Sequence, residues 1–197
     1  MSSASMAPVA TGVAVASALV IYFARIAELR TKRETVAGPV REQTTLRLFV
    51  LAGSAMLVGS IVEQLRFARP FSIGLFVAGW AFAAASFAIR RSAIRALGRF
   101  WSLHVEIRAQ HELVKEGPFG FVRHPVYTSM IFELLAFALL LQSMYTAVGV
   151  LFVFVPTLVW RIVTEERALV AKFGEAYEEY RRTTPSLVPA PWKRVRA

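Results

Sequence analysis

Long runs of apolar residues alternate with arginine-rich segments along most of this chain. Five of the runs, at residues 8–27, 46–62, 71–89, 125–141 and 145–163, approach the roughly 20 residues that a membrane-spanning helix needs. Only residues 142–144 separate the last two runs, which predicts a tight antiparallel hairpin. The pattern therefore predicts an all-α, polytopic membrane protein with five transmembrane helices.

The pattern becomes amphipathic after the fifth run. The segment TEERALVAKFGEAYEEYRR, residues 164–182, predicts a cytoplasmic C-terminal helix that is broken or bent at Gly174. The following segment holds three prolines and cannot continue a helix. We therefore expect one membrane domain over residues 1–197. Residues 1–90 would form its three N-terminal transmembrane helices, and residues 91–197 its binding and catalytic region.

The basic residues predict how these helices are oriented. The net charge is +10, and 56% of the 197 residues are hydrophobic. Twenty of the 23 lysines and arginines fall in alternate loops and the C-terminal segment, so we expect the N-terminus outside and the C-terminus in the cytoplasm. Because the charges lie at membrane ends, they indicate contact with membrane lipid and no nucleic-acid binding. The absence of cysteine excludes disulfides and thiolate chemistry.

Three histidines, His104, His111 and His124, fall on the predicted cytoplasmic side. Pro125 is suited to the first turn of a helix, which would place His124 at its cap and His124 and Tyr127 on one face. That pair is typical either of an interfacial anchor or of an anion site at a helix N-terminus. The histidine spacing matches no zinc motif, so we expect no metal.

Arg161, Glu165 and Glu133 are charged candidates inside or at the end of predicted spans. Arg161 and Glu165 are four residues apart, which favours either a structural ion pair or a pair that binds an anionic and a cationic ligand group. Glu133 lies about two turns into the fourth span and must face protein or a polar cavity. It either bonds another helix, with Arg25 as a candidate partner, or lines a substrate cavity.

Three segments in order carry a resemblance to a known family. They are HELVKEGPFGFVRHPVY, then RIVTEE, then FGEAYEEY with a late proline, and together they span about residues 101–189. This chain resembles the isoprenylcysteine carboxyl methyltransferase (ICMT) family, as a bacterial-type member. It differs at Phe119, where the family has a tyrosine, and at Ser129, where a glycine is common.

The resemblance implies an integral membrane O-methyltransferase that uses S-adenosyl-L-methionine and releases S-adenosyl-L-homocysteine. It implies a lipophilic small-molecule or lipidated acceptor, with an isoprenylcysteine-like carboxylate or another oxygen nucleophile. Arg161 falls on the arginine that orients the substrate, and Glu133 is a second candidate for the acceptor side. Small size and family type imply a prokaryotic inner membrane. The cosubstrate contacts implied are His104, His111, Leu113, Val114, His124, Pro125, Tyr127 and Glu165.

Three other classes of protein share part of this pattern. A phospholipid N-methyltransferase shares the R-H-P-x-Y and E-E elements but methylates an amine headgroup. A sterol-reductase-like enzyme has a related membrane architecture and uses NADPH. A non-catalytic membrane scaffold or transporter is the third, although no internal repeat indicates a transporter.

Overall fold

The computed structural model describes residues 3–30, 44–67, 70–101 and 113–189, and every regular element in these ranges is helical. Two elements are short 3₁₀ turns and the rest are α-helices, which agrees with the predicted all-α class. In chain order they are α1 (Ser3–Arg30), α2 (Thr44–Phe67), α3 (Ile73–Leu97), η1 (Gly98–Phe100), η2 (Gly117–Gly120), α4 (Pro125–Leu140), α5 (Met144–Phe173) and α6 (Glu175–Thr183).

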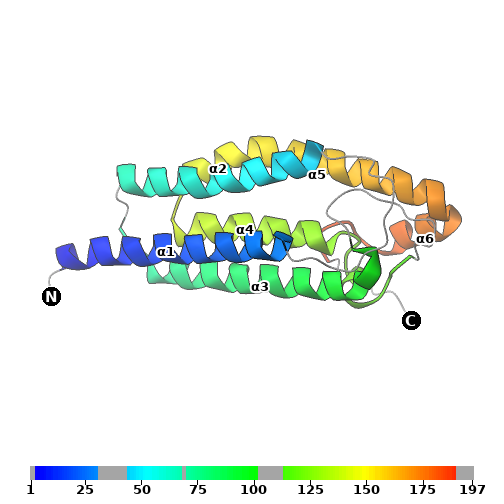
Figure 1. Cartoon of the computed structure of the whole chain (residues 1–197), viewed down its shortest axis with the longest axis horizontal. Coiled ribbons are helices and arrows are strands. Elements are labelled where there is room, and N and C mark those ends of the chain that lie inside the picture. The colour runs from blue at the N-terminus through cyan, green and yellow to red at the C-terminus, as the bar shows by residue number, and fades with distance from the viewer. Residues whose placement is uncertain (1–2, 31–43, 68–69, 102–112, 190–197) are drawn as a thin grey trace.

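The long helices run side by side along the long axis of the molecule (Figure 1). α3 packs most extensively against α4, and α2 packs against α5. The predicted hairpin is confirmed, because only residues 141–143 separate α4 from α5. The turn between them lies at one end of the bundle, while η2, α6 and the start of α4 gather at the other end (Figure 1).

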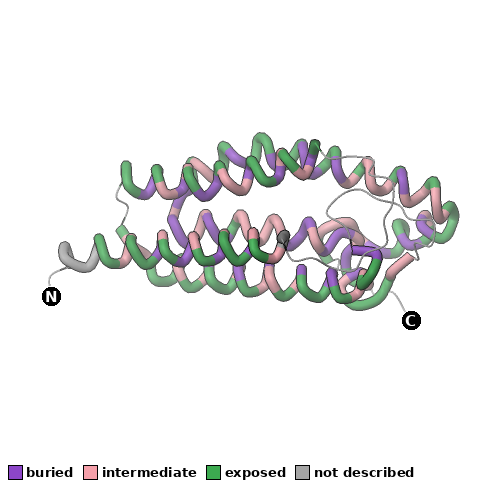
Figure 2. Tube along the Cα trace, viewed as in Figure 1, coloured by how far each residue is buried: buried purple, intermediate pink, exposed green. Residues whose placement is uncertain are grey.

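Four helical segments are long and apolar enough to cross a membrane: Pro8–Glu28, Thr44–Phe67, Ile73–Phe100 and Met144–Phe173. The chain is accordingly an integral membrane protein. α4 is apolar but has 16 residues, so it spans about 24 Å where the hydrocarbon core measures about 30 Å. Exposed positions recur along the outer faces of the helices (Figure 2). They include large apolar side chains such as Ile73 and Phe152, which are suited to contact with lipid.

The predicted boundary between the fifth span and the C-terminal helix is wrong. α5 continues without interruption to Phe173, because no helix-breaking residue follows Val163 until Gly174. The predicted break at Gly174 is confirmed. Its φ of 54° is a left-handed conformation that favours glycine, and α6 begins at the next residue. The long α5 therefore carries charged residues directly from the bundle to α6.

A close approach between α3 and α4 fixes their relative position. A Cβ atom added at Gly79 would lie 2.7 Å from Leu140 Cγ and 2.9 Å from the Leu140 backbone nitrogen. Only glycine fits at this distance, so the helices meet backbone to backbone near the end of α4. This contact anchors α4 at one end, while its first turn lies in the site described next.

Candidate functional site

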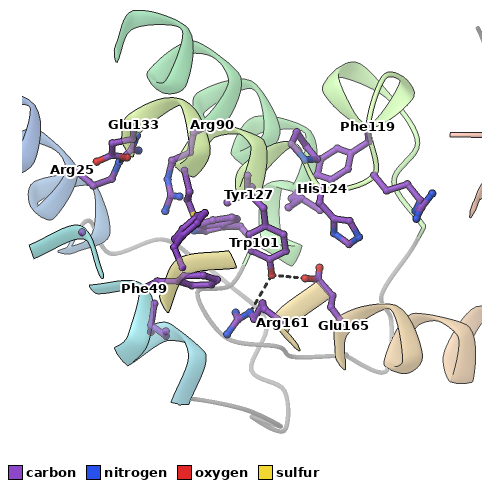
Figure 3. Close-up of a pocket in the computed structure, with 18 of the residues that line it drawn as sticks. Arg25, Phe49, Arg90, Trp101, Phe119, His124, Tyr127, Glu133, Arg161 and Glu165 are labelled. Atoms are coloured by element: carbon purple, nitrogen blue, oxygen red, sulfur yellow. Dashed lines mark hydrogen bonds and ion pairs between the residues drawn. The ribbon is translucent and has the colours of Figure 1, made fainter. Parts of the chain in front are cut away.

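A cavity of about 240 Å³ lies where η2 and α6 meet the ends of the long helices. Residues from α1 to α6 line it, so α1 and α2 are part of the site as well as the C-terminal half (Figure 3). The structure brings together all of the predicted site residues that it describes: Leu113, Val114, His124, Pro125, Tyr127, Glu133, Arg161 and Glu165. His104 and His111, which were also predicted, lie outside the described residues.

The start of α4 is held by the chain segment that follows α6. The backbone N–H of Arg123 donates to Pro185 O at 2.9 Å, and that of His124 donates to Ser186 O at 3.0 Å. The Thr128 hydroxyl donates to Leu187 O at 2.8 Å. We name residues 184–187 the C-terminal strap. It fixes both the backbone before α4 and the first turn of this helix against the cavity.

Glu166 of α5 pairs electrostatically with the R-H-P motif. Its Oε1 accepts from Arg123 Nε at 3.0 Å and Nη2 at 2.7 Å, and it lies 3.0 Å from His124 Nε2. Arg123 also donates through Nη1 to the carbonyls of Arg181 and Thr184. These groups are largely buried, so the ion pair is shielded from water. Arg123 therefore has a structural role at this position.

The central polar feature of the cavity is a line of three side chains from two helices. Tyr127 Oη donates to Glu165 Oε2 at 2.5 Å and accepts from Arg161 Nε at 3.0 Å (Figure 3). Arg161 Nη1 donates to Thr45 Oγ1 of α2 at 2.8 Å. The simple Arg161–Glu165 pair considered from the sequence is thus mediated by the Tyr127 hydroxyl. The arrangement fixes a guanidinium and a carboxylate a short distance apart in one cavity wall.

Aromatic rings surround this line. Phe49 of α2 lies 6.3 Å from the Tyr127 ring, and His124 stacks on Tyr127 with ring centroids 5.5 Å apart. On the α6 side, Tyr180 Oη donates to the Phe119 carbonyl at 2.6 Å. Burial raises the pKa of the Tyr180 hydroxyl well above its ordinary value, which keeps it protonated. The rings close the cavity around its few polar groups.

A second polar cluster lies at the α1 end of the cavity. Arg25 Nε donates to Glu133 Oε2 at 2.6 Å, and Arg25 Nη2 donates to Ser86 Oγ at 3.0 Å. Glu28 pairs with Arg25 and lies 3.5 Å from Arg90. The predicted bond from Glu133 to another helix is confirmed, with Arg25 as its partner. The cluster ties α1, α3 and α4 together, and both positive charges at this depth are matched by carboxylates.

Sequence reasoning missed several residues of the site. Phe49 and Trp101, which line the cavity, and Thr45, which accepts from Arg161, carry no motif. The packing of distant helices brings them to the site. Glu166 did carry a signal, since it is the second acidic residue of the R-x-x-x-E-E segment. Its role depends on Arg123, which lies 43 positions earlier in the chain. No spacing rule links two such residues.

The arrangement has the chemistry to bind a ligand with both signs of charge. Glu165 offers a carboxylate to a cationic group, and Arg161 offers a planar guanidinium to an anionic group. Apolar residues such as Leu134, Phe137 and Phe154 line the part of the cavity between the helices. Among the described residues, no three His, Cys, Asp or Glu side chains come together as a metal site. The geometry therefore favours an organic ligand with an apolar part.

Comparison with known proteins identifies a related family. Residues 79–171 match the model of the isoprenylcysteine carboxyl methyltransferase (ICMT) family. The chain is 34% identical over 103 residues to the protein-S-isoprenylcysteine O-methyltransferase of Schizosaccharomyces pombe, covering 51% of this chain and 44% of the relative.

Two further relatives each match about half of the chain. Protein-S-isoprenylcysteine O-methyltransferase B of Arabidopsis thaliana is 32% identical over 103 residues, which is 51% of this chain and 52% of the relative. Cobalt-zinc-cadmium resistance protein CzcN of Cupriavidus metallidurans is 31% identical over 94 residues, covering 47% of this chain and 43% of the relative. The chain thus matches about half the length of these curated relatives.

Proposed function

We propose that this chain is a member of the isoprenylcysteine carboxyl methyltransferase family and transfers a methyl group from S-adenosyl-L-methionine to the carboxylate of a lipophilic, isoprenylcysteine-like acceptor. One observation carries the proposal. Arg161, Tyr127 and Glu165 are joined in one wall of a single cavity, which places a site for an anion beside a site for a cation. A carboxylate acceptor and an ammonium-bearing cosubstrate need those two sites.

The residues of the cavity fit the cosubstrate. Glu165 would take the ammonium of the methionine moiety, because its carboxylate faces the cavity and is held by Tyr127. His124 and Tyr127 would present polar edges, while Leu113 and Val114 would form an apolar wall. His104 and His111, outside the described residues, remain proposed contacts from the family resemblance. When bound, S-adenosylmethionine supplies an electrophilic methyl group on a sulfonium.

Arg161 would orient the acceptor. Its guanidinium is only 5% exposed and is fixed by Tyr127 and Thr45. A fixed guanidinium can aim a carboxylate oxygen, and such orientation contributes several kcal/mol, on the order of a thousandfold in rate. A carboxylate is ionised at neutral pH, so the reaction needs no general base. Glu133 is proposed on the acceptor side of the cavity, where its bond to Arg25 would fix the wall.

The acceptor would enter from the bilayer between α4 and α5. Their apolar side chains line the cavity, and both helices lie within an integral membrane protein. In this proposal α4 serves as a fifth span, despite its 16 residues, and membrane lipid surrounds the bundle. The N-terminus would lie outside and the C-terminus in the cytoplasm, in a prokaryotic inner membrane. This places the cosubstrate side of the cavity in the cytoplasm.

The test is methyl transfer by purified protein in lipid nanodiscs. Labelled S-adenosylmethionine is offered with S-farnesylated N-acetylcysteine, and base-labile methyl ester is measured. We expect Arg161→Ala to lower kcat/KM by about a hundredfold or more, while affinity for S-adenosylhomocysteine stays within about twofold of wild type. Arg182→Ala, at an exposed position outside the cavity, is the matched control and should behave as wild type.

Three results would contradict the proposal. One is equal ester formation by Arg161→Ala and wild type. Another is labelling of phosphatidylethanolamine in the nanodisc without ester formation, which would indicate an amine methyltransferase. The third is that folded wild type binds no S-adenosylhomocysteine.

A further inference from the structure

The hydroxyl of Tyr177 is a buried polar group whose role the preceding sections leave open. Tyr177 lies in the first turn of α6, is 1% exposed, and lines the cavity. Its Oη atom has no hydrogen-bond partner among the residues that the structure describes. Burying a hydroxyl without a partner costs stability, so such groups are rare and call for an explanation. A ligand in the cavity would provide the missing partner.

The surroundings of Tyr177 keep this hydroxyl protonated. Burial raises the pKa of the hydroxyl above its ordinary value and the carboxylate of Glu166 raises it further, while Arg123 opposes the rise only in part. It therefore stays protonated at neutral pH. The Tyr180 ring packs edge-on at 5.9 Å and restricts the orientation of Tyr177. The hydroxyl is thus held in one place with a proton to donate.

Arg123 is the charged side chain that could otherwise donate to an anionic ligand group on this side of the cavity, but its guanidinium already has protein partners. Arg123 lines the cavity, and its guanidinium donates to Glu166 and to the carbonyls of Arg181 and Thr184. Tyr177 and Glu165 both line this cavity. A ligand group that sits beside the ammonium on Glu165 and needs a hydrogen-bond donor would therefore meet the Tyr177 hydroxyl.

We propose that the Tyr177 hydroxyl donates a hydrogen bond to the α-carboxylate of the methionine moiety of the cosubstrate, while Glu165 holds the ammonium of the same moiety. This inference rests on the proposed function. The two groups share one carbon atom in the ligand, so their partners must lie close together in the protein. A neutral hydroxyl is suited to this place because it can donate to a ligand carboxylate without changing the net charge of the cavity wall.

The test compares two ligands on two variants by calorimetry. S-adenosylhomocysteine carries the α-carboxylate, and 5′-methylthioadenosine lacks the whole amino-acid moiety. We expect Tyr177→Phe to weaken S-adenosylhomocysteine about tenfold, since a hydrogen bond to a charged group is lost. Affinity for 5′-methylthioadenosine should stay within about twofold, because that ligand never meets the hydroxyl. Tyr145→Phe, which removes an exposed hydroxyl on α5, is the matched control.

A stability measurement separates a ligand-binding role from a structural one. Without ligand, Tyr177→Phe removes a buried hydroxyl that has no partner, so its unfolding temperature should equal or exceed that of wild type. With saturating S-adenosylhomocysteine, the rise in unfolding temperature should be smaller than in wild type, because the ligand binds more weakly. A hydroxyl that only supported the fold would instead lower the unfolding temperature without ligand.

Two outcomes would overturn the role of Tyr177 and leave the proposed function standing. One is unchanged S-adenosylhomocysteine affinity in Tyr177→Phe beside a wild type that binds. The other is an equal loss of affinity for both ligands, which would indicate a distorted cavity. If folded wild type binds 5′-methylthioadenosine and S-adenosylhomocysteine equally weakly or not at all, the proposed function and this inference both fall.

Discussion

Removing the carboxylate of Glu166 should loosen the side-chain network that ties the segment before α4 to α5 and, through Arg123, to the C-terminal strap. Its Oε1 atom receives three hydrogen bonds, two from Arg123 and one shared with His124 Nε2. The side chains of Glu166, Arg123 and His124 are 14%, 10% and 2% exposed, so water cannot readily replace the lost partner. Glu166→Ala would leave a buried guanidinium without its carboxylate.

The cost follows from that burial. Removing one partner of a buried ion pair destabilises by about 3–5 kcal/mol, because the other charge is left uncompensated. Arg123 keeps its bonds to the strap carbonyls, so we take the lower end of this range. For a chain of this size, about 3 kcal/mol lowers the unfolding temperature by roughly 6–12 °C. Glu166→Gln keeps one acceptor oxygen and should lose about half as much.

The assay is thermal unfolding of detergent-solubilised protein, followed by tryptophan fluorescence at fixed detergent and protein concentration. Glu179→Ala is the matched control, because Glu179 lies near the same end of the chain and pairs with Arg182 at an exposed position. That control should change the unfolding temperature by about 1 °C or less. If Glu166→Ala and Glu179→Ala unfold at the same temperature, the buried pair does not hold the strap as described.

Two further predictions concern groups outside the central polar line. Glu63 accepts from the backbone N–H groups of Tyr145 and Thr146 at 3.2 and 2.7 Å, so it caps α5 at the turn end of the bundle. Glu63→Gln should lower stability by about 1–2 kcal/mol without changing S-adenosylhomocysteine affinity; altered affinity would show that this end couples to the cavity. Burial raises the pKa values of Tyr177 and Tyr180, so both stay protonated in the folded protein after they begin to ionise in the unfolded chain. Their titration therefore leaves stability unchanged below about pH 10 and lowers it as the pH rises further. The unfolding temperature should therefore fall above about pH 10, less steeply in Tyr180→Phe, and an identical slope would contradict the assignment.

The helices could be predicted from hydropathy, but some of their ends could not. The apolar run that predicted the third span stops at residue 89, while α3 continues to Leu97. Arg90 is buried in that extension beside Glu28 of α1, so tertiary pairing carries the helix past the point where the apolar pattern ends. From the sequence alone, Arg90 indicates the end of the span, because its pairing with Glu28 is visible only in the fold.

Some residues of the site could likewise be predicted from local sequence motifs, whereas others are brought there only by contacts between distant helices. The site residues predicted between positions 113 and 127 and the pair Arg161 and Glu165 follow from contiguous motifs, and they line one cavity. Thr45 lies 116 positions from Arg161, from which it accepts a hydrogen bond, and belongs to a helix outside the residues that match the family model. The Tyr127 hydroxyl between Arg161 and Glu165 is likewise a product of packing between α4 and α5. Contacts of this kind could not be predicted from the sequence, because they depend on how distant helices pack.

The most direct test of the central claim is calorimetric binding of S-adenosylhomocysteine to detergent-purified wild type beside Glu165→Ala. The Glu165 carboxylate is the group proposed to hold the ligand ammonium, and Tyr127 fixes it in the cavity wall. We predict micromolar binding to wild type and a loss of about tenfold to a hundredfold in the variant, as expected for a hydrogen bond to a charged group. Equal affinity in both proteins would remove Glu165 from the site. No binding to folded wild type would contradict the methyltransferase account itself.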